Sequence, residues 1–336
     1  MQSFADIIGQ ASIKEHLRKS LQTGKISHAY IFYGEKGSGK KTLADLFARA
    51  LQCESGEAEP CNQCISCKQA MNRNQPDIIY LQHEKPNVIS VDEIRRQINN
   101  DIGIKPYSSE RKIYIIDEAE KMNVQAQNAL LKTLEEPPAY ATILLLTTNL
   151  EAMLQTIRSR CVTLTIKPIA DTEIQRYLMR EVQIPDYKAG ICAAFARGNV
   201  GRARELAVSA EFEELKEETL QLVQRLSEKS LSDLAAVAKS KAEKGSNTEG
   251  FLELIQMWYR DVLMYKSTGS GQVLIFSEEL PSIKKLAHQL TYEGLNRILE
   301  TVEVTRTRLA GNVNAELTLE WLLLVMHSGG NGGSRG

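Results

Sequence analysis

The sequence predicts an α/β protein, with a parallel sheet in its first half and helices alone in its second half. Short apolar runs alternate with helical patterns from Ala29 to Lys167. This alternation predicts a parallel sheet with helices on both faces and a ligand at the carboxyl ends of the strands. From Pro168 onward the strand patterns stop and the remaining patterns are helical.

The composition is that of an ordinary soluble globular protein. The chain has 336 residues, of which 43% are hydrophobic and 25% charged, which suits two or three domains. Its net charge of −1 argues against a protein that holds nucleic acid by itself through a large basic face. No apolar stretch approaches the ~18 residues of a membrane span, and Met1 to Asp6 is not a signal peptide. We therefore expect a cytosolic protein, not associated with membranes, whose cysteines are reduced or metal-bound.

A phosphate-binding loop lies between the first strand and the following helix. The apolar run Ala29 to Tyr33 enters a glycine-rich turn, and a helical pattern continues to about Leu51. Backbone N–H groups of such a turn can surround phosphate oxygens, and a lysine adds a point charge. A chance glycine turn is the alternative. The residues expected to bind nucleotide here are Gly34, Gly37, Gly39, Lys40, Lys41 and Thr42.

The loop departs from the usual pattern at one position. Lys41 stands where a serine or threonine hydroxyl would hold Mg²⁺. Thr42 follows, but one step along a helix turns a side chain by about 100°, so we expect its hydroxyl to point elsewhere. The sequence therefore predicts a nucleotide loop with a damaged metal ligand, at which bound Mg²⁺ is doubtful.

Four of the six cysteines are clustered with spacings typical of a metal site. They are Cys53, Cys61, Cys64 and Cys67, and short x2 spacings let neighbouring thiolates bind one ion. We predict a closed structural Zn²⁺ site; free thiols and an iron–sulfur cluster are the alternatives.

Acidic and polar residues follow the later strands. Asp117 ends the run from Arg111 and is placed to hold Mg²⁺ through water, and Glu118 to polarise an attacking water. Thr148 or Asn149, at the end of the apolar run from Thr142, could sense a terminal phosphate. A solvated strand end is the alternative for the two acids.

The other expected elements follow from periodicity and caps. Ser90 and Glu93 form a capping box, and the helix they open carries Arg95 and Arg96, for which a solvated face is favoured over a phosphate contact. The further expected strands are 77–82 and 162–167. The expected helices are one ending near Leu21, 123–136, 171–182, 188–197, one from Arg202, and the segments 211–227, 230–242, 248–267, 279–289 and 291–326.

Taken together, these motifs resemble the bacterial clamp-loader branch of the AAA+ ATPases, which opens the sliding clamp of the replicative polymerase. The resemblance rests on the following motifs: IIGQ at Ile7 to Gln10, HAYIF at His28 to Phe32, the phosphate loop, the cysteine module, DEAE at Asp117 to Glu120, NALLKTLEEPP at Asn128 to Pro138 and SRC at Ser159 to Cys161. The resemblance implies a Rossmann-like AAA+ core at 1–167 with the zinc module at 53–67, a helical lid at 168–208 and an all-helical collar at 209–327. The tail from 328 to 336 is expected to be disordered.

Within this group, three departures favour the stator type of subunit over the ATP-hydrolysing motor type (gamma/tau). Lys41 replaces the metal-binding hydroxyl, Gly201 stands where the lid's sensor arginine aligns, and the basic aromatic leader of motor subunits is missing. Arg202 or Arg204 could substitute for that sensor.

The resemblance implies a division of one active site between two chains. Arg160 would act in trans on a motor neighbour's ATP, so intrinsic ATPase is expected to be weak or absent. An arginine bound to a local carboxylate is the alternative for Arg160. The implied partners are gamma/tau motor subunits and the delta subunit in a hetero-pentamer, the sliding clamp, and primed DNA inside the assembly. The alternative functions are that of a gamma/tau-type motor subunit and that of a stand-alone AAA+ regulator.

Overall fold

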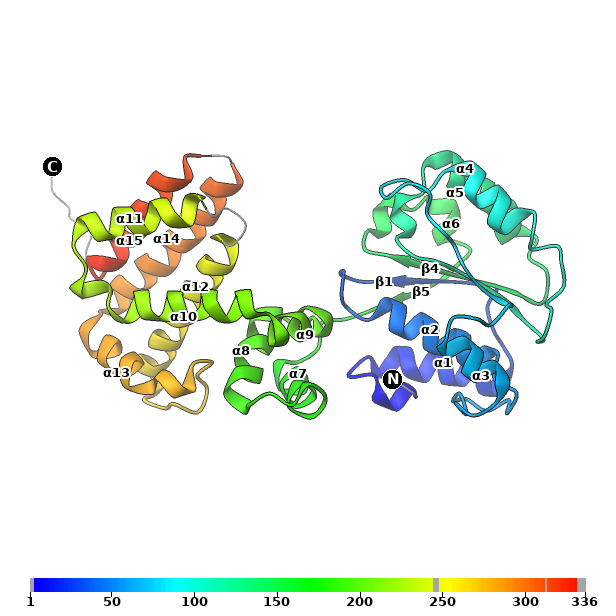
Figure 1. Cartoon of the computed structure of the whole chain (residues 1–336), viewed down its shortest axis with the longest axis horizontal. Coiled ribbons are helices and arrows are strands. Elements are labelled where there is room, and N and C mark those ends of the chain that lie inside the picture. Colours follow the sequence, from blue (N-terminus) through cyan, green and yellow to red (C-terminus); the bar gives the residue numbers. More distant parts are fainter. Residues whose placement is uncertain (1–2, 244–247, 312, 331–336) are drawn as a thin grey trace. The chain divides into compact units, whose positions relative to one another are not determined.

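The computed structural model describes residues 3–243, 248–311 and 313–330 and contains two compact units. The first unit is formed by Met1–Ile174 together with Arg197–Arg202, and the second by Gln175–Ala196 together with Ala203–Gly336. Figure 1 shows a sheet in the first unit and helices alone in the second, as the alternation of sequence patterns predicts.

The first unit is built on a five-stranded parallel sheet of order β2-β3-β4-β1-β5. The strands are β1 (Ala29–Tyr33), β2 (Ile78–Tyr80), β3 (Lys112–Ile116), β4 (Ala141–Thr147) and β5 (Val162–Thr165). Strand β4 is central, and its neighbour β1 pairs with β4 on one side and β5 on the other, with Ile31 opposite Leu145 and Thr163. Strands β1, β3 and β4 are buried along almost their whole length, which is why they read as nearly continuous apolar runs in the sequence.

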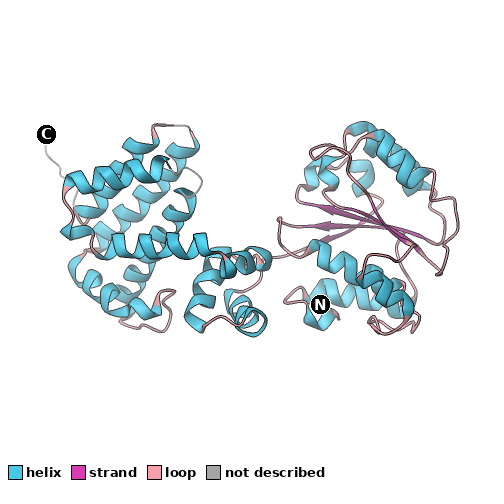
Figure 2. Ribbon diagram, in the orientation of Figure 1, coloured by secondary structure: helices cyan, strands magenta, loops and turns pink. Residues whose placement is uncertain are grey.

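Helices cover both faces of this sheet (Figures 1 and 2). One face carries α1 (Ala11–Thr23), α2 (Lys40–Leu51) and α3 (Ile65–Met71), and the other carries α4 (Val91–Ile94) with its continuation η2 (Arg95–Asn99), α5 (Val124–Glu135) and α6 (Gln155–Arg158). Each face buries its own apolar core: Leu17 and Phe47 belong to the first, and Leu130 and Ile157 to the second. The described residues of this unit also include short helical turns at Phe4–Asp6 (η1), Ala119–Lys121 (η3) and Leu150–Ala152 (η4).

The second unit is helical throughout its described residues. Two helices, α7 (Asp171–Tyr177) and α9 (Val200–Val208), span the division between the units. The others are η5 (Leu178–Val182), α8 (Asp186–Ala196), α10 (Ala210–Gln224), η6 (Leu226–Glu228), α11 (Leu231–Glu243), α12 (Thr248–Thr268), η8 (Ser277–Glu279), α13 (Leu280–Gln289), α14 (Tyr292–Ala310) and α15 (Ala315–His327). Helix α12 forms the centre of its core, since Phe251, Trp258 and Tyr259 are almost fully buried.

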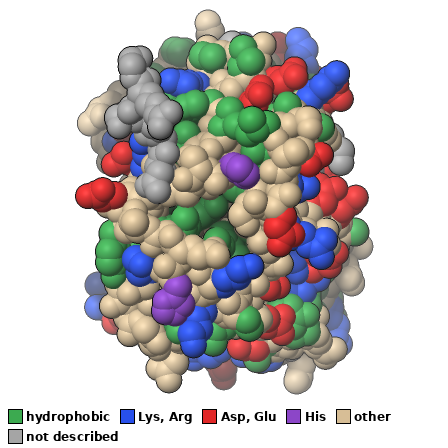
Figure 3. Space-filling view, turned by 90° about the vertical axis from the view of Figure 1, so that its left-hand side faces the viewer, with side chains coloured by type: hydrophobic (Ala, Val, Ile, Leu, Met, Phe, Trp, Pro, Cys, Tyr) green, Lys and Arg blue, Asp and Glu red, His purple; other side chains and the backbone are tan. Residues whose placement is uncertain are grey.

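Hydrophobic side chains also gather in the middle of one outer face of this unit (Figure 3). Exposed apolar residues of the unit include Leu317 and Leu324 of α15. No helix among the described residues is both long and apolar enough to cross a bilayer.

Two helix predictions in the second half were wrong in their bounds. The segment 291–326 is two helices, because α14 ends at Ala310 and Asn314 caps a new helix by accepting a bond from Leu317 N–H. The helix expected from Arg202 begins earlier, at Val200.

The first residues of the expected tail follow α15 directly. Ser328 to Gly330 form a turn in which Gly330 N–H donates to Val325 O at 3.0 Å, and the disorder of the tail stays a prediction. Residues 331–336 of that prediction lie outside the described residues.

Candidate functional site

The phosphate loop joins β1 to α2 at the carboxyl edge of the sheet, as the sequence predicts. Gly37 and Gly39 have φ angles of 82° and 96°, in the left-handed region where a side chain would be strained. Gly34 N–H donates to Thr147 O at 3.2 Å, which ties the loop to the end of β4. Two positions of this loop therefore require glycine, as the sequence pattern of a phosphate loop predicts.

The loop lysine is bonded within its own loop. Lys40 is only 9% exposed, and its Nζ donates to Gly34 O at 2.7 Å and to Glu35 O at 2.8 Å. Burial lowers the pKa of Lys40, while the nearby carboxylates of Glu120 and Asp117 oppose this shift. The ammonium group that would meet a phosphate oxygen thus already has two carbonyl partners.

The second lysine neutralises the acid expected to hold magnesium. Lys41 Nζ lies 2.8 Å from Asp117 Oδ2, and both side chains are partly exposed. Thr42 is exposed on the same helix. A cation already sits on the Asp117 carboxylate, so the residues present do not fit a tightly bound Mg²⁺ ion at this position.

The other acids of the strand end are also paired. Glu118 has a left-handed φ of 51°, and its carboxylate lies 2.6 Å from Lys121 Nζ. Thr148 Oγ1 donates to Glu120 Oε1 at 2.5 Å. Sequence reasoning did not single out Glu120, although it is the third acid in the DEAE run and acts on Lys40.

The start of α9 packs directly against the phosphate loop. Asn199 Nδ2 donates to Lys36 O at 2.8 Å, and Gly201 N–H donates to Gly37 O at 3.1 Å. A side chain at Gly201 would place its Cβ 2.4 Å from Gly37 O, so only glycine allows this approach. Asn199 Oδ1 also accepts from Arg202 N–H, which explains why the helix begins before Arg202.

A small cavity beside this contact leaves little room for a ligand. Its volume is about 240 Å³, below the roughly 300–1,000 Å³ of ordinary ligand sites. It is lined by residues from the loop, the end of β5 and the approach to α9, including Ser38, Ile166, Pro168 and Gly198.

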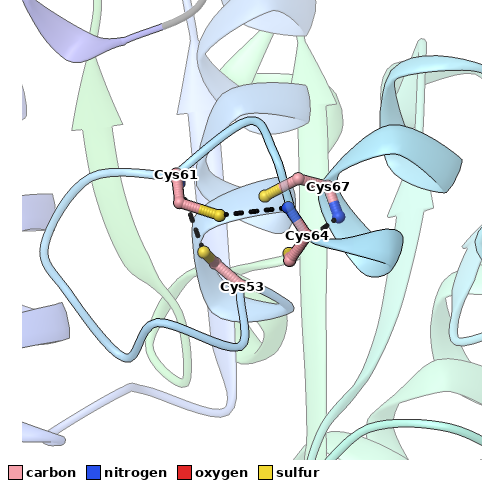
Figure 4. A group of neighbouring side chains, drawn as sticks. All are labelled: Cys53, Cys61, Cys64 and Cys67. Carbon is pink, nitrogen blue, oxygen red and sulfur yellow. Dashed lines mark hydrogen bonds between the residues drawn. The ribbon is translucent and has the colours of Figure 1, made fainter.

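The four clustered cysteines converge as predicted (Figure 4). Their sulfur atoms all lie within 4.8 Å of one another, near the roughly 3.8 Å edge expected for tetrahedral Zn–S bonds of about 2.3 Å. Backbone N–H groups of Cys64 and Gln63 lower the pKa of the Cys61 thiol to about 6, whereas burial raises the pKa of Cys67. This donor set fits a closed structural metal site, and Cys161 and Cys192 lie outside it.

The cysteine module is attached to the N-terminal helix. Glu59 accepts from Phe4 N–H at 2.9 Å, and its other oxygen lies 2.5 Å from Arg18 Nη2. A metal held by the four thiolates would therefore stabilise the loop that anchors the start of the chain.

Arg160 lies on the surface of the first unit, between α6 and β5. Its side chain is 36% exposed, and its Nη2 lies 2.9 Å from Glu135 Oε1. Nη1 donates to Thr156 O at 2.9 Å. The basic pair Arg95 and Arg96 is also ion-paired, with Asp92 and Glu84 respectively.

Two family models match most of the chain. The model described as DNA polymerase III, delta subunit, matches residues 9–170, and the model of its C-terminal part matches residues 210–328. The DNA polymerase III subunit delta' of Bacillus subtilis is 32% identical over 95% of this chain and 97% of its own length. The chain belongs to the DNA polymerase III delta-prime family.

Members of a related family are also similar to this delta-prime family chain. The DNA polymerase III subunit tau of Bacillus subtilis is 31% identical over 89% of the chain, which spans 57% of that relative. Among solved structures, a gamma subunit-related protein of Thermotoga maritima has a TM-score of 0.41 at 19% identity, covering 95% of this chain and 98% of its own. The RuvB branch migration motor of the same organism has a TM-score of 0.45 at 20% identity, over 66% of each chain.

Proposed function

We propose that this delta-prime family protein is the stator of a bacterial clamp loader, whose Arg160 completes the ATP site of a neighbouring motor subunit. The observation that carries the proposal is the Lys41–Asp117 ion pair, because it occupies the acid that a working ATPase needs for magnesium. A chain that cannot seat the metal contributes to hydrolysis through what it presents to another chain.

The pairing of the other loop residues supports a weak or absent intrinsic ATPase. Lys40 is bonded to its own loop, and Gly201 holds the loop against α9. Nucleotide would have to displace these contacts before its phosphates could meet the loop amides. Gly34, Gly37, Gly39, Lys40 and Thr148 would bind it, with Lys41 and Thr42 beside them.

Arg160 supplies the chemistry that this proposal requires. ATP hydrolysis builds negative charge on the transferred phosphoryl oxygens, and a guanidinium placed there accelerates the reaction about 10³–10⁵-fold. The exposed position of Arg160 between α6 and β5 suits a group that reaches another molecule. Its pairing with Glu135 is local and leaves it at the surface.

The remaining parts of the proposal concern partners and cofactors. We infer that Cys53, Cys61, Cys64 and Cys67 hold a structural Zn²⁺ ion. The partners are gamma/tau motor subunits and the delta subunit in a hetero-pentamer of the DNA polymerase III holoenzyme, acting on the sliding clamp and primed DNA in the cytoplasm. The near-neutral net charge suits DNA contact only within that assembly.

The experiment is reconstitution of the complex with Arg160→Ala. We expect normal assembly, but ATP hydrolysis and clamp loading on primed DNA should fall sharply. Arg158→Ala is the matched control, because Arg158 is a neighbouring arginine paired with Glu151. Normal clamp loading by the Arg160 variant would refute the trans role.

A motor function is the second candidate, favoured by the intact glycines of the loop, by Asp117 with Glu118, and by the similarity to tau. Turnover by the isolated chain separates the two. A DNA-stimulated rate of about 1 s⁻¹ or more would support the motor. Copurification with proteins other than replication subunits would instead support a stand-alone regulator.

A further inference from the structure

We infer that Glu135 is a positioning residue for Arg160, holding the guanidinium in a fixed direction before a neighbour's nucleotide arrives. This inference rests on the proposed trans role of Arg160. It adds a residue from a different helix to the part of the molecule that faces the neighbouring chain.

The geometry restrains the guanidinium at two points. Glu135 Oε1 lies 2.9 Å from Nη2, and Thr156 O accepts from Nη1 at 2.9 Å. The carboxylate comes from the last residue of α5 and the carbonyl from α6, so the two helices together define the direction of the side chain. Nη1 also lies 3.5 Å from Ser159 Oγ.

The position of Glu135 on its helix indicates that this side chain does not stabilise the helix. The carboxyl end of a helix carries partial negative charge, and an acidic side chain there is unfavourable. Glu135 and Glu136 both lie at this end of α5. Of these two glutamates, only Glu135 forms an ion pair within the described part of the chain, and its partner is Arg160.

The restrained guanidinium keeps donors for a ligand. A guanidinium has five N–H donors; the contacts with Glu135 and Thr156 use two of them and the 3.5 Å bond to Ser159 Oγ uses a third, which leaves two. Arg160 can therefore meet phosphate oxygens without first leaving Glu135. If the long side chain of Arg160 is already held in place, the entropic cost of ordering it no longer adds to the activation barrier of the neighbour's reaction.

The negative charge of Glu135 also weakens the electrostatic effect of the Arg160 guanidinium on a neighbour's phosphates. This effect would lower the rate of hydrolysis, whereas positioning would raise it. If the charge effect dominated, removing Glu135 would accelerate hydrolysis. The two variants Glu135→Ala and Glu135→Gln separate these effects, because the amide keeps an acceptor oxygen but carries no charge.

The test uses the complete complex with ATP, clamp and primed DNA. We expect Glu135→Ala to lower kcat for ATP about three- to tenfold with KM unchanged, the range for one long side chain left unrestrained. Glu135→Gln should stay within about twofold of the unaltered complex, because its oxygen still accepts. Glu136→Ala is the matched control and should leave kcat unchanged.

A double variant distinguishes this inference from the proposed function. Adding Glu135→Ala to Arg160→Ala should have no further effect, because Glu135 acts only through Arg160. If Arg160→Ala alone leaves ATP hydrolysis unchanged, the proposed function fails. If Arg160→Ala is inactive but Glu135→Ala equals Glu136→Ala, raises kcat, or is matched by Glu135→Gln, the positioning role alone is refuted.

Discussion

Replacing Gly201 with alanine tests whether the start of α9 locks the phosphate loop. The added Cβ would lie 2.4 Å from Gly37 O and 2.9 Å from Gly37 Cα, closer than carbon and backbone atoms can approach. Both contacts are with backbone, so no flexible side chain can move aside. The loop and the start of α9 must separate, which breaks the 3.1 Å bond from Gly201 N–H to Gly37 O.

The net effect follows from three terms. Overpacking of this kind costs about 1–3 kcal/mol, and a lost hydrogen bond about 0.5–1.5 kcal/mol. Alanine is better than glycine in a helix by about 0.5–1 kcal/mol, which offsets part of the loss. We therefore expect the free energy of unfolding of the first unit to fall by about 0.5–4 kcal/mol.

Urea unfolding and amide hydrogen exchange measure this loss. Exchange should accelerate at the amides of residues 34–39 and 199–202. Gly190→Ala, within α8, is the control: its Cβ would meet only the flexible end of Gln175, and the variant should gain about 0.5–1 kcal/mol. Unchanged stability and exchange in Gly201→Ala would refute the packing of α9 on the loop.

Three further predictions concern the metal sites and the helical core. Lys41→Thr removes a partly exposed ion pair, so stability should change by less than about 1 kcal/mol, while calorimetry should detect Mg²⁺-dependent ATP binding that the original chain lacks. Its absence would mean that Lys41 is not the defect. Cys64→Ser, or a strong chelator, should release the metal measured by elemental analysis and lower the melting temperature, whereas Cys161→Ala should retain it. Equal metal content in both variants would contradict the assigned ligands. Burial raises the pKa of Asp261 to about 6, above its unfolded value of 3.8, so its contribution to stability falls as pH rises between these values. The stability of Asp261→Asn relative to the original chain should therefore increase from pH 4 to pH 7 in urea unfolding, and a decrease would contradict the raised pKa.

The elements that depend on local pattern could be predicted from the amino-acid sequence. The five strands, the glycine loop and the four cysteines were all predicted, because periodicity, turn residues and short ligand spacings act over a few residues. The interruption of the last predicted helix was missed. Gly311 and Asn314 were available as signals there, but the apolar pattern continues across them.

Contacts between residues far apart in the chain could not be predicted in this way and are seen in the folded structure alone. The fold places Asp117 beside Lys41, which is 76 positions away, so a cationic side chain already pairs with the acid that the sequence predicts to hold Mg²⁺. It also brings Glu135 to Arg160 and Gly201 to the loop. Such contacts arise from the packing of whole helices on a sheet, and no spacing along the chain encodes them, because each depends on the path of every element between the two residues.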